Sequence, residues 1–212
     1  MSIWPLFDIR ISTPRLEMTP VRESDMFALI ELADEGIHDP TTMPFVNPFT
    51  DEPLPLRHWN SVRFYFHCWA EWTPERWHLP FAVRSDGVLI GAQDMLANDF
   101  TQRRVAESGS WIGIAHQGNG YGKEMRHALM HLAFEGLGAT AMHSAAFWDN
   151  GASIGVSRAL GYVENGVDTM MRRDEPERLL RFRLDRHVWE ERRRDDIDIA
   201  GLDEALPMFG LD

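Results

Sequence analysis

The sequence predicts an α/β (α+β) fold, with a mixed central sheet of about six to seven strands and helices on both faces. Three short runs of alternating apolar residues, a pattern typical of strands, follow one another between residues 79 and 115. A strand, a glycine-rich turn, a helix and another strand then succeed each other up to residue 148. That order requires a crossover connection, so the strand before the glycine-rich turn and the strand after the helix are expected to be parallel.

Composition limits the class of protein. The chain has 212 residues, of which 44% are hydrophobic, enough for one full core. We therefore expect residues 1–212 to form a single domain, with residues 187–212 as a C-terminal extension that docks on it. The net charge of -12 argues against a nucleic-acid partner. The single cysteine, Cys68, excludes an internal disulfide framework and fits a reducing compartment.

Targeting signals are not found in the sequence. No basic cluster followed by a long apolar run stands near the N-terminus, and no stretch of about 18 apolar residues exists. We expect a cytoplasmic protein without a membrane partner. The abundant Trp and Phe residues permit a homodimer or a higher homo-oligomer.

The first third of the chain predicts one strand, two helices and a long loop. The strand covers residues 16–21, and the first helix follows and ends at Gly36. Five prolines between residues 37 and 55 exclude helix there, and a loop this long is expected to fold over the substrate side. Residues 56–72 then predict a second helix, on which Trp59, Val62, Phe66 and Trp69 form a stripe at helical spacing. Its aromatic residues are expected to be buried, and a role in the acceptor site is the alternative.

The middle and end of the chain alternate between strands and helices. Asp86-Gly87 predicts a hairpin turn between residues 79–83 and 88–96, and Gly91 predicts a bulge. Further strands are expected over residues 104–115, 139–148 and 180–184, and a short helix ends near Gly161.

The most informative stretch is the glycine-rich turn that follows residue 115. Gly118, Gly120 and Gly122 alternate just where an apolar helical stripe begins at Tyr121. The N-terminus of a helix presents unpaired N–H groups, and glycines let a phosphate approach them, so we infer a pyrophosphate site. A Walker loop would need Ser or Thr after Lys123 to bind magnesium, and the absence of that hydroxyl counts against a nucleotide phosphotransferase.

The spacing Gln117-x-x-Gly120-x-Gly122 resembles the loop of the GNAT superfamily of acyl-CoA-dependent N-acyltransferases. The order of strands and helices is also similar to the GNAT fold. The segments 13–16, Thr-Pro-Arg-Leu, and Asn150-x-x-Ser153 resemble the ribosomal-protein N-acetyltransferase branch. Matches spread along the chain, among them His-Asp-Pro at 38–40 and Ser-Gly-Ser-Trp at 108–111, look like a mycobacterial GNAT succinyltransferase.

The resemblance implies how a coenzyme A (CoA) thioester binds. The strand at residues 111–115 splays from the strand at 145–148, and the pantetheine arm adds between them. The donor is acetyl-CoA or succinyl-CoA, and the acceptor is a primary amine of a small molecule or a protein. No metal is expected, because no two histidines or carboxylates have the spacing of metal ligands. The residues expected to bind the cofactor are Trp111, Ile112, Gly113, Ile114, Gln117, Gly118, Asn119, Gly120, Tyr121, Gly122, Lys123 and Asn150.

Two residues are the candidates for catalysis. Ser153 is expected near the CoA sulfur, as a donor to the departing thiolate. Ser157 stands where many relatives carry a tyrosine that acts as the general acid. Glu107 is the candidate base for the amine, although a surface carboxylate at a strand end is an equally good interpretation. Gln93 and Asp94 are further acceptor contacts. A non-catalytic acyl-CoA sensor on the same fold is the main alternative to an enzyme.

Overall fold

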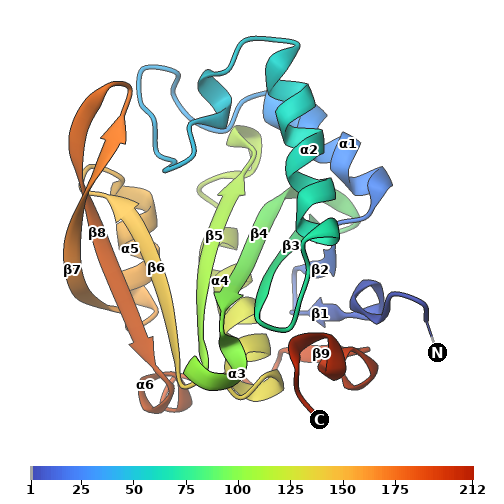
Figure 1. Ribbon diagram of the computed structural model, residues 1–212. Helices are drawn as coiled ribbons and strands as arrows, with labels where there is room; N and C mark the ends of the chain where they lie inside the picture. Colours follow the sequence, from blue (N-terminus) through green and yellow to red (C-terminus); the bar gives the residue numbers. More distant parts are fainter. Residues whose placement is uncertain (1) are drawn as a thin grey trace.

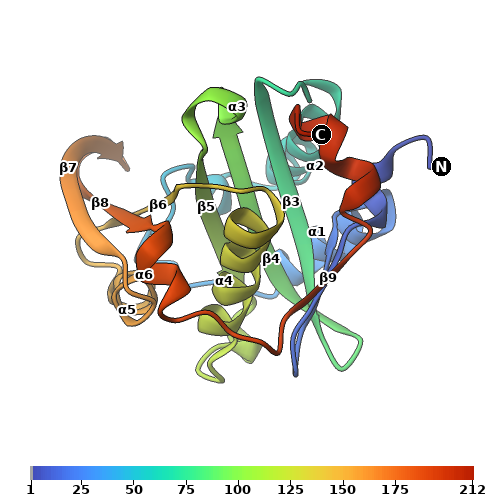
Figure 2. The same ribbon diagram turned by 90° about the horizontal axis from the view of Figure 1, so that it is seen from below.

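A computed structural model describes residues 2–212 and shows one mixed sheet of nine strands, in the order β7-β8-β6-β5-β4-β3-β2-β1-β9. Helices lie on both of its faces (Figures 1 and 2). The strands are β1 (Arg10–Ser12), β2 (Glu17–Pro20), β3 (Arg76–Ser85), β4 (Val88–Asn98), β5 (Val105–Ile112), β6 (Ala141–Phe147), β7 (Val163–Arg172), β8 (Glu175–Asp185) and β9 (Asp198–Ala200). The α-helices are α1 (Glu23–Asp34), α2 (Leu56–Ala70), α3 (Phe100–Arg103), α4 (Tyr121–His131), α5 (Gly151–Ala159) and α6 (Arg186–Glu190).

Strands β5 and β6 run parallel, whereas all other neighbouring strands described for residues 2–212 are antiparallel. Helix α4 lies between β5 and β6 in the sequence and forms the crossover connection that was predicted for a parallel pair. The mixed sheet is therefore confirmed. The number of strands is higher than the six to seven expected, because the short β1 and β9 and the solvent-exposed β7 lack a clear apolar alternation.

The two parallel strands stay paired over only part of their length. Residues 105–108 of β5 pair with residues 141–144 of β6, and the pairing stops at Ser108 and Ser144. Beyond that point β5 continues beside β4 to Ile112, and β6 continues beside β8 to Phe147. The two strands thus diverge into a V, which is visible near the middle of Figure 1.

The sheet separates two apolar layers. Helix α4 packs on one face, where Ala106 and Met142 join its core cluster, and α1 and α2 pack on the other face (Figure 2). Trp111 and Ala92 join the cluster of α1 and α2. Because side chains alternate along a strand, even-numbered residues of β5 and β6 face α4 and odd-numbered residues face the opposite side.

Helix α2 buries a different face from the one expected. Tyr65 and Cys68 are buried, whereas Trp59 and Phe66 are 56% and 48% exposed. The aromatic residues of this helix satisfy a helical period on more than one face, so periodicity alone did not identify the face that meets β3. The helix is confirmed, but its predicted stripe is buried only in part: Val62 packs against the cluster of α1 and α2, whereas Trp59 and Phe66 are exposed.

The register of β3 against β4 shifts beside Gly91. Val83 pairs with Gly91, while Arg84 pairs with Leu89, so Ile90 is an extra residue. A Cβ atom on Gly91 would lie 2.3 Å from the carbonyl oxygen of Trp111. Glycine is thus required where β4 approaches β5, and the predicted bulge is confirmed.

The last residues of the chain return to the sheet edge at β1. Strand β9 pairs with β1 through Arg10–Ser12, and Phe209 is fully buried. The indole N–H of Trp72 donates a 2.8 Å hydrogen bond to the carbonyl oxygen of Met208. These contacts attach the C-terminal segment to the edge of the sheet that lies farthest from β7.

Candidate active site

The glycine-rich turn presents free backbone N–H groups at the start of α4. Gly118 and Gly120 have φ values of +78° and +81°, which favour glycine. Among residues 2–212, no protein acceptor is found for the five amides at positions 118–122. The amide of Gln117 donates to Ile114, and that of Lys123 donates to Gly120. The amides at 118–122 are therefore available to an anion, whereas those of Gln117 and Lys123, which were also expected to bind the cofactor, already have partners within the protein.

A buried carboxylate fixes this turn to the N-terminal segment. Glu124, on the first turn of α4, is 5% exposed and accepts hydrogen bonds from the Thr13 hydroxyl (2.6 Å) and Arg15 Nε (2.6 Å). Burial raises the pKa of Glu124, but the bonds from Thr13 and Arg15 outweigh it, and the net pKa is lowered. Arg15 Nη1 also donates to the carbonyl oxygen of Asn119 (3.0 Å). The carboxylate thus orders the turn through Arg15.

Several predicted cofactor residues make contacts within the protein. The side chain of Gln117 donates to the carbonyl oxygens of Ile37 (2.6 Å) and Ile112 (2.8 Å). The Tyr121 ring lies beneath the guanidinium of Arg15, 4.9 Å away. Gln117 therefore holds the end of β5 in place, and its side chain is not free for a ligand.

The amides at the end of β5 are also occupied. That of Gly113 donates to Ile90 and that of Ile114 donates to Gly36, both over 2.9 Å. Lys123 is exposed, and within residues 2–212 its ammonium has no ion-pair partner. Trp111 and Ile112 are half-buried on the β5 side of the V, where the pantetheine arm was expected.

Polar residues gather on the α4 side of the V. Arg126 of α4 is 3% exposed, and its guanidinium lies 3.1 Å from the Ser144 hydroxyl and 3.3 Å from the Ser110 hydroxyl. Ser110 is on β5 and Ser144 is on β6, so this one side chain spans the point where the strands part. Gln93 faces the same side and is fully buried.

A second polar group lies on the opposite side of the V. Glu107 pairs in register with His143, and its side chain is exposed. Burial lowers the pKa of His143, and although Glu107 opposes this, the nearby arginines add to the lowering. His143 is consequently neutral at neutral pH and lies beside the carboxylate that the sequence identified as a candidate base.

Asp94 faces the same side, across from Gly109, and forms an ion pair with His78 over 3.2 Å. Burial lowers the pKa of His78, but hydrogen bonds with Asp94 and Cys68 outweigh it and raise the pKa to about 10. His78 is therefore charged at neutral pH and balances the charge of Asp94. Glu107 is left as the exposed carboxylate beside a neutral histidine.

Helix α5 carries the second predicted motif. Asn150 caps the helix, with its side-chain oxygen accepting from the Ser153 amide (3.1 Å) and its NH₂ group 3.5 Å from the carbonyl oxygen of Pro44. The Ser153 side chain is half-buried, and its hydroxyl finds no partner among residues 2–212. Ser157 is fully buried and its hydroxyl is likewise unpartnered within the described chain.

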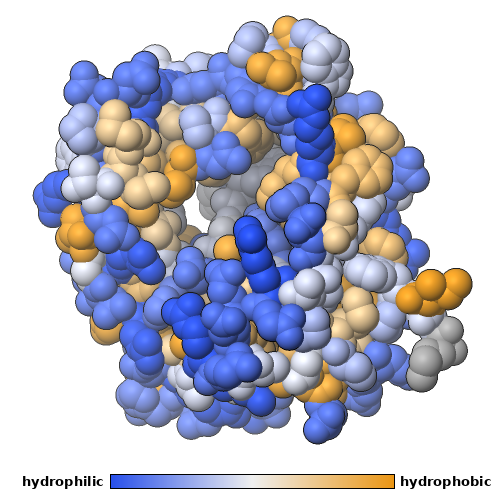
Figure 3. All heavy atoms as spheres, in the orientation of Figure 1, coloured by the Kyte–Doolittle hydropathy of each residue, from blue (hydrophilic) through white to orange (hydrophobic). Residues whose placement is uncertain are grey.

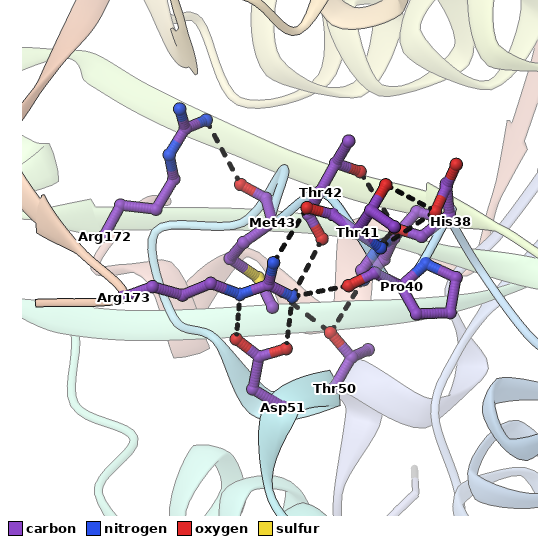
Figure 4. A network of polar contacts seen from close by, with 10 residues as sticks. His38, Pro40, Thr41, Thr42, Met43, Thr50, Asp51, Arg172 and Arg173 are labelled. Atoms are coloured by element: carbon purple, nitrogen blue, oxygen red, sulfur yellow. Dashed lines mark hydrogen bonds and ion pairs between the residues drawn. The ribbon is translucent and has the colours of Figure 1, made fainter. Parts of the chain in front are cut away.

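The proline-rich loop, residues 37–55, crosses the V, and we call it the strap. Arg173, in the β7–β8 turn, donates to both carboxylate oxygens of Asp51 (2.7 Å each) and to the carbonyl oxygens of Pro40, Thr41 and Thr42 (Figure 4). Arg172 binds Asp149 beside it. The strap thus connects the β5 half of the sheet to the β6 half, as Figure 1 shows at the top of the molecule.

Below the strap the surface is hollowed. Figure 3 shows this hollow between the part of the molecule that carries β6 to β8 and the part that carries α2, β3 and β4. The hollow lies over the V, on the side that Glu107 and Asp94 face. An acceptor can reach the V from this side, while the free amides of the glycine-rich turn lie at the end of β5.

A sequence profile described as the acetyltransferase (GNAT) domain matches residues 15–163, about 70% of the chain. The chain belongs to the GNAT acetyltransferase family. The predicted GNAT fold is thereby confirmed.

Solved structures show the same fold as this GNAT domain. RimJ from Mycobacterium smegmatis, in complex with a CoA disulfide, has a TM-score of 0.69 at 20% identity, with 86% of this chain and 90% of that chain covered. RimL, an alpha-N-protein acetyltransferase in complex with CoA, has a TM-score of 0.65 at 16% identity, covering 82% and 95%. A spermidine N-acetyltransferase from Vibrio cholerae, in complex with CoA and spermine, has a TM-score of 0.66 at 16% identity, covering 83% and 98%.

The described part of this GNAT domain was searched for membrane-spanning helices and for metal-binding clusters. Over residues 2–212, no helix combines the length and the apolar character needed to cross a bilayer. In the same range, no three His, Cys, Asp or Glu side chains are grouped so as to hold a metal ion.

Sequence reasoning missed three parts of the GNAT site. The contact of Arg15 with Glu124 joins positions 109 apart, and nothing in the local sequence indicates it. Arg126 stands on an otherwise apolar helical face, and this interruption was the available signal. His143 was included in a strand without a role, although its partner Glu107 was singled out.

Proposed function

We propose that this GNAT protein is an acyl-CoA-dependent N-acyltransferase that transfers an acetyl or succinyl group to a primary amine of a small molecule or a protein. The observation that carries the proposal is the V between β5 and β6, which opens next to five unpaired amides. Those amides suit a pyrophosphate. The exposed backbone edges of the diverging strands suit an extended pantetheine arm.

The proposed chemistry is a direct transfer. The amine nitrogen attacks the thioester carbonyl carbon, the carbon–sulfur bond breaks, and CoA leaves as a thiolate that takes up a proton. Before the attack, Glu107, beside the neutral His143, takes one proton from the substrate ammonium and so generates the neutral amine. After the attack the nitrogen loses a second proton, which balances the proton that the thiolate takes up. Ser153 donates a hydrogen bond to the sulfur. Because a thiol has a pKa near 8.5, roughly that of free cysteine, the thiolate needs little help to leave.

The acceptor side of the V supports an amine as substrate. Glu107 is exposed, and Asp94 faces the same side of the sheet. A cationic amine is attracted to such carboxylates before it is deprotonated. Two of the similar structures are a spermidine N-acetyltransferase and an alpha-N-protein acetyltransferase, so the acceptors of those proteins are a polyamine and a protein N-terminus. Both are primary amines, and we extend that class of acceptor to this chain.

Release of free thiol in the presence of acetyl-CoA or succinyl-CoA and a panel of amines tests the proposal. We expect turnover with the wild type, and a large loss of kcat in Glu107→Gln and Ser153→Ala with little change in the dissociation constant for CoA. Ser24→Ala is the matched control, because Ser24 is exposed on the first turn of α1. If CoA binds but no amine and no donor gives turnover, the protein is an acyl-CoA-binding sensor instead.

A further inference from the structure

Arg126 is a buried cation without a counter-charge. Arg126 is only 3% exposed. Within residues 2–212 it forms no salt bridge. Its partners are uncharged hydroxyls, those of Ser110 and Ser144. The buried Tyr162 hydroxyl is also close, because the Arg126 charge and hydrogen bonding partly offset the rise that burial causes in the pKa of Tyr162. Its Nε–H is buried with no acceptor in that same range. A buried charge costs several kcal/mol unless it is paired, so this guanidinium calls for an anion.

The position of Arg126 relates it to the acyl group. The guanidinium bridges β5 and β6 within two residues of the last paired position, at the narrow end of the V. Glu107 and Asp94 lie on the opposite side of the sheet, where the acceptor enters. A thioester held in the V with its carbonyl open to the acceptor therefore directs its acyl chain towards α4. That direction leads to Arg126.

We propose that Arg126 binds the terminal carboxylate of a carboxylate-bearing acyl-CoA, such as succinyl-CoA, and so selects the donor. This inference rests on the proposed acyltransfer function. In an extended succinyl group the carboxylate carbon lies about 4 Å beyond the thioester carbon, three bonds away. An acetyl group ends after one bond and leaves the guanidinium unpaired. The planar guanidinium matches a carboxylate, and the free Nε–H supplies an unused donor.

The other polar groups on this side agree with that assignment. The Ser110 and Ser144 hydroxyls bind the guanidinium and hold it in place across the gap. The Gln93 side chain donates to the carbonyl oxygen of Gly109 (2.6 Å), while its own oxygen is buried without a partner in the described chain. That oxygen would repel a carboxylate, so the anion is expected beside Arg126 and the two serines and away from Gln93.

Binding measured by calorimetry without any acceptor tests the inference. The ligands are CoA, acetyl-CoA, succinyl-CoA and succinamyl-CoA, the last being a neutral amide of the same shape as the succinyl group. We expect the wild type to bind succinyl-CoA about tenfold to a hundredfold more tightly than succinamyl-CoA, as for a hydrogen-bonded charge. Arg126→Met should abolish that preference, so that succinyl-CoA and succinamyl-CoA bind the variant equally. Arg126→Lys, which keeps the charge without the planar geometry, should retain part of it.

The comparison of succinyl-CoA with succinamyl-CoA needs no variant, so it stands even if Arg126→Met fails to fold. Arg10→Met is the matched control, because Arg10 is exposed on β1 and, within residues 2–212, its ion pair is with the exposed Glu17. Equal affinity of the wild type for the two ligands would overturn the inference. A uniform loss of affinity for every ligand in Arg126→Met would do the same, since it would assign Arg126 to holding the strands. If no form of CoA binds the wild type, the proposed function itself fails.

Discussion

The carboxylate of Glu124 is expected to stabilise both the fold and the CoA site. It accepts hydrogen bonds from the Thr13 hydroxyl, from Arg15 Nε and from the Arg15 amide (3.2 Å). A buried hydrogen bond to a charged group contributes about 1.5–3 kcal/mol. The Arg15 side chain is 47% exposed, so solvent screens its share. For Glu124→Gln we therefore expect a loss of about 2–3 kcal/mol of unfolding free energy.

The loss of Glu124 can be measured by urea and thermal unfolding. A change of this size lowers the melting temperature of a domain of this length by roughly 4–12 °C. The variant should also bind CoA about three- to tenfold more weakly, because Arg15 no longer positions the carbonyl oxygen of Asn119. Glu164→Gln, which removes an exposed ion-pair partner of Arg158, should leave both quantities nearly unchanged.

The pH dependence of stability follows from the lowered pKa of Glu124. A carboxyl whose folded-state pKa lies below its unfolded value of about 4.3 contributes stability above that value and loses it as the pH falls through the folded pKa. The difference between the wild type and Glu124→Gln should therefore shrink as the pH falls below about 4. A Glu124→Gln variant with wild-type stability and wild-type CoA affinity would refute the role given to this carboxylate.

Three further predictions concern other parts of the molecule. Gly120→Ala should weaken CoA binding by about tenfold or more, because φ is +81° there and the amide must stay accessible, whereas Gly155→Ala in α5, where a Cβ meets nothing within 4 Å, should bind CoA normally. Because the pKa of His78 is raised to about 10, its ion pair with Asp94 contributes stability that is fully present below pH 6.5 and is lost as the pH rises through 10. In His78→Gln, the unfolding free energy should therefore fall less between pH 6.5 and 10 than it does in the wild type. Arg173→Ala should speed proteolysis within residues 37–55 without lowering the melting temperature of the sheet, and unchanged protection would contradict the bridging role of the strap.

Burial and long-range pairing account for the errors of the sequence interpretation. The α2 stripe was assigned to Trp59 and Phe66 because their spacing fits a helix, yet the sheet buries Tyr65 and Cys68 instead. A helix with aromatic residues on several faces carries no local information about which face meets a sheet. Strand β9 was missed for a similar reason, since its three residues form a strand only by pairing with β1.

The sequence alone determined most of the order of strands and helices and the glycine-rich turn, because strand alternation, the helical period and the spacing of glycines are local properties of the chain. The GNAT fold was predicted from the resemblance of that order, and of residues 117–122, to a known family. The tertiary structure alone decided which groups meet. It brought Arg15 to Glu124, placed Arg126 across the gap between β5 and β6, and set His143 beside Glu107. These pairings depend on the crossover of the parallel strands and on the side of the sheet that each residue faces, and neither is encoded within a short stretch of sequence.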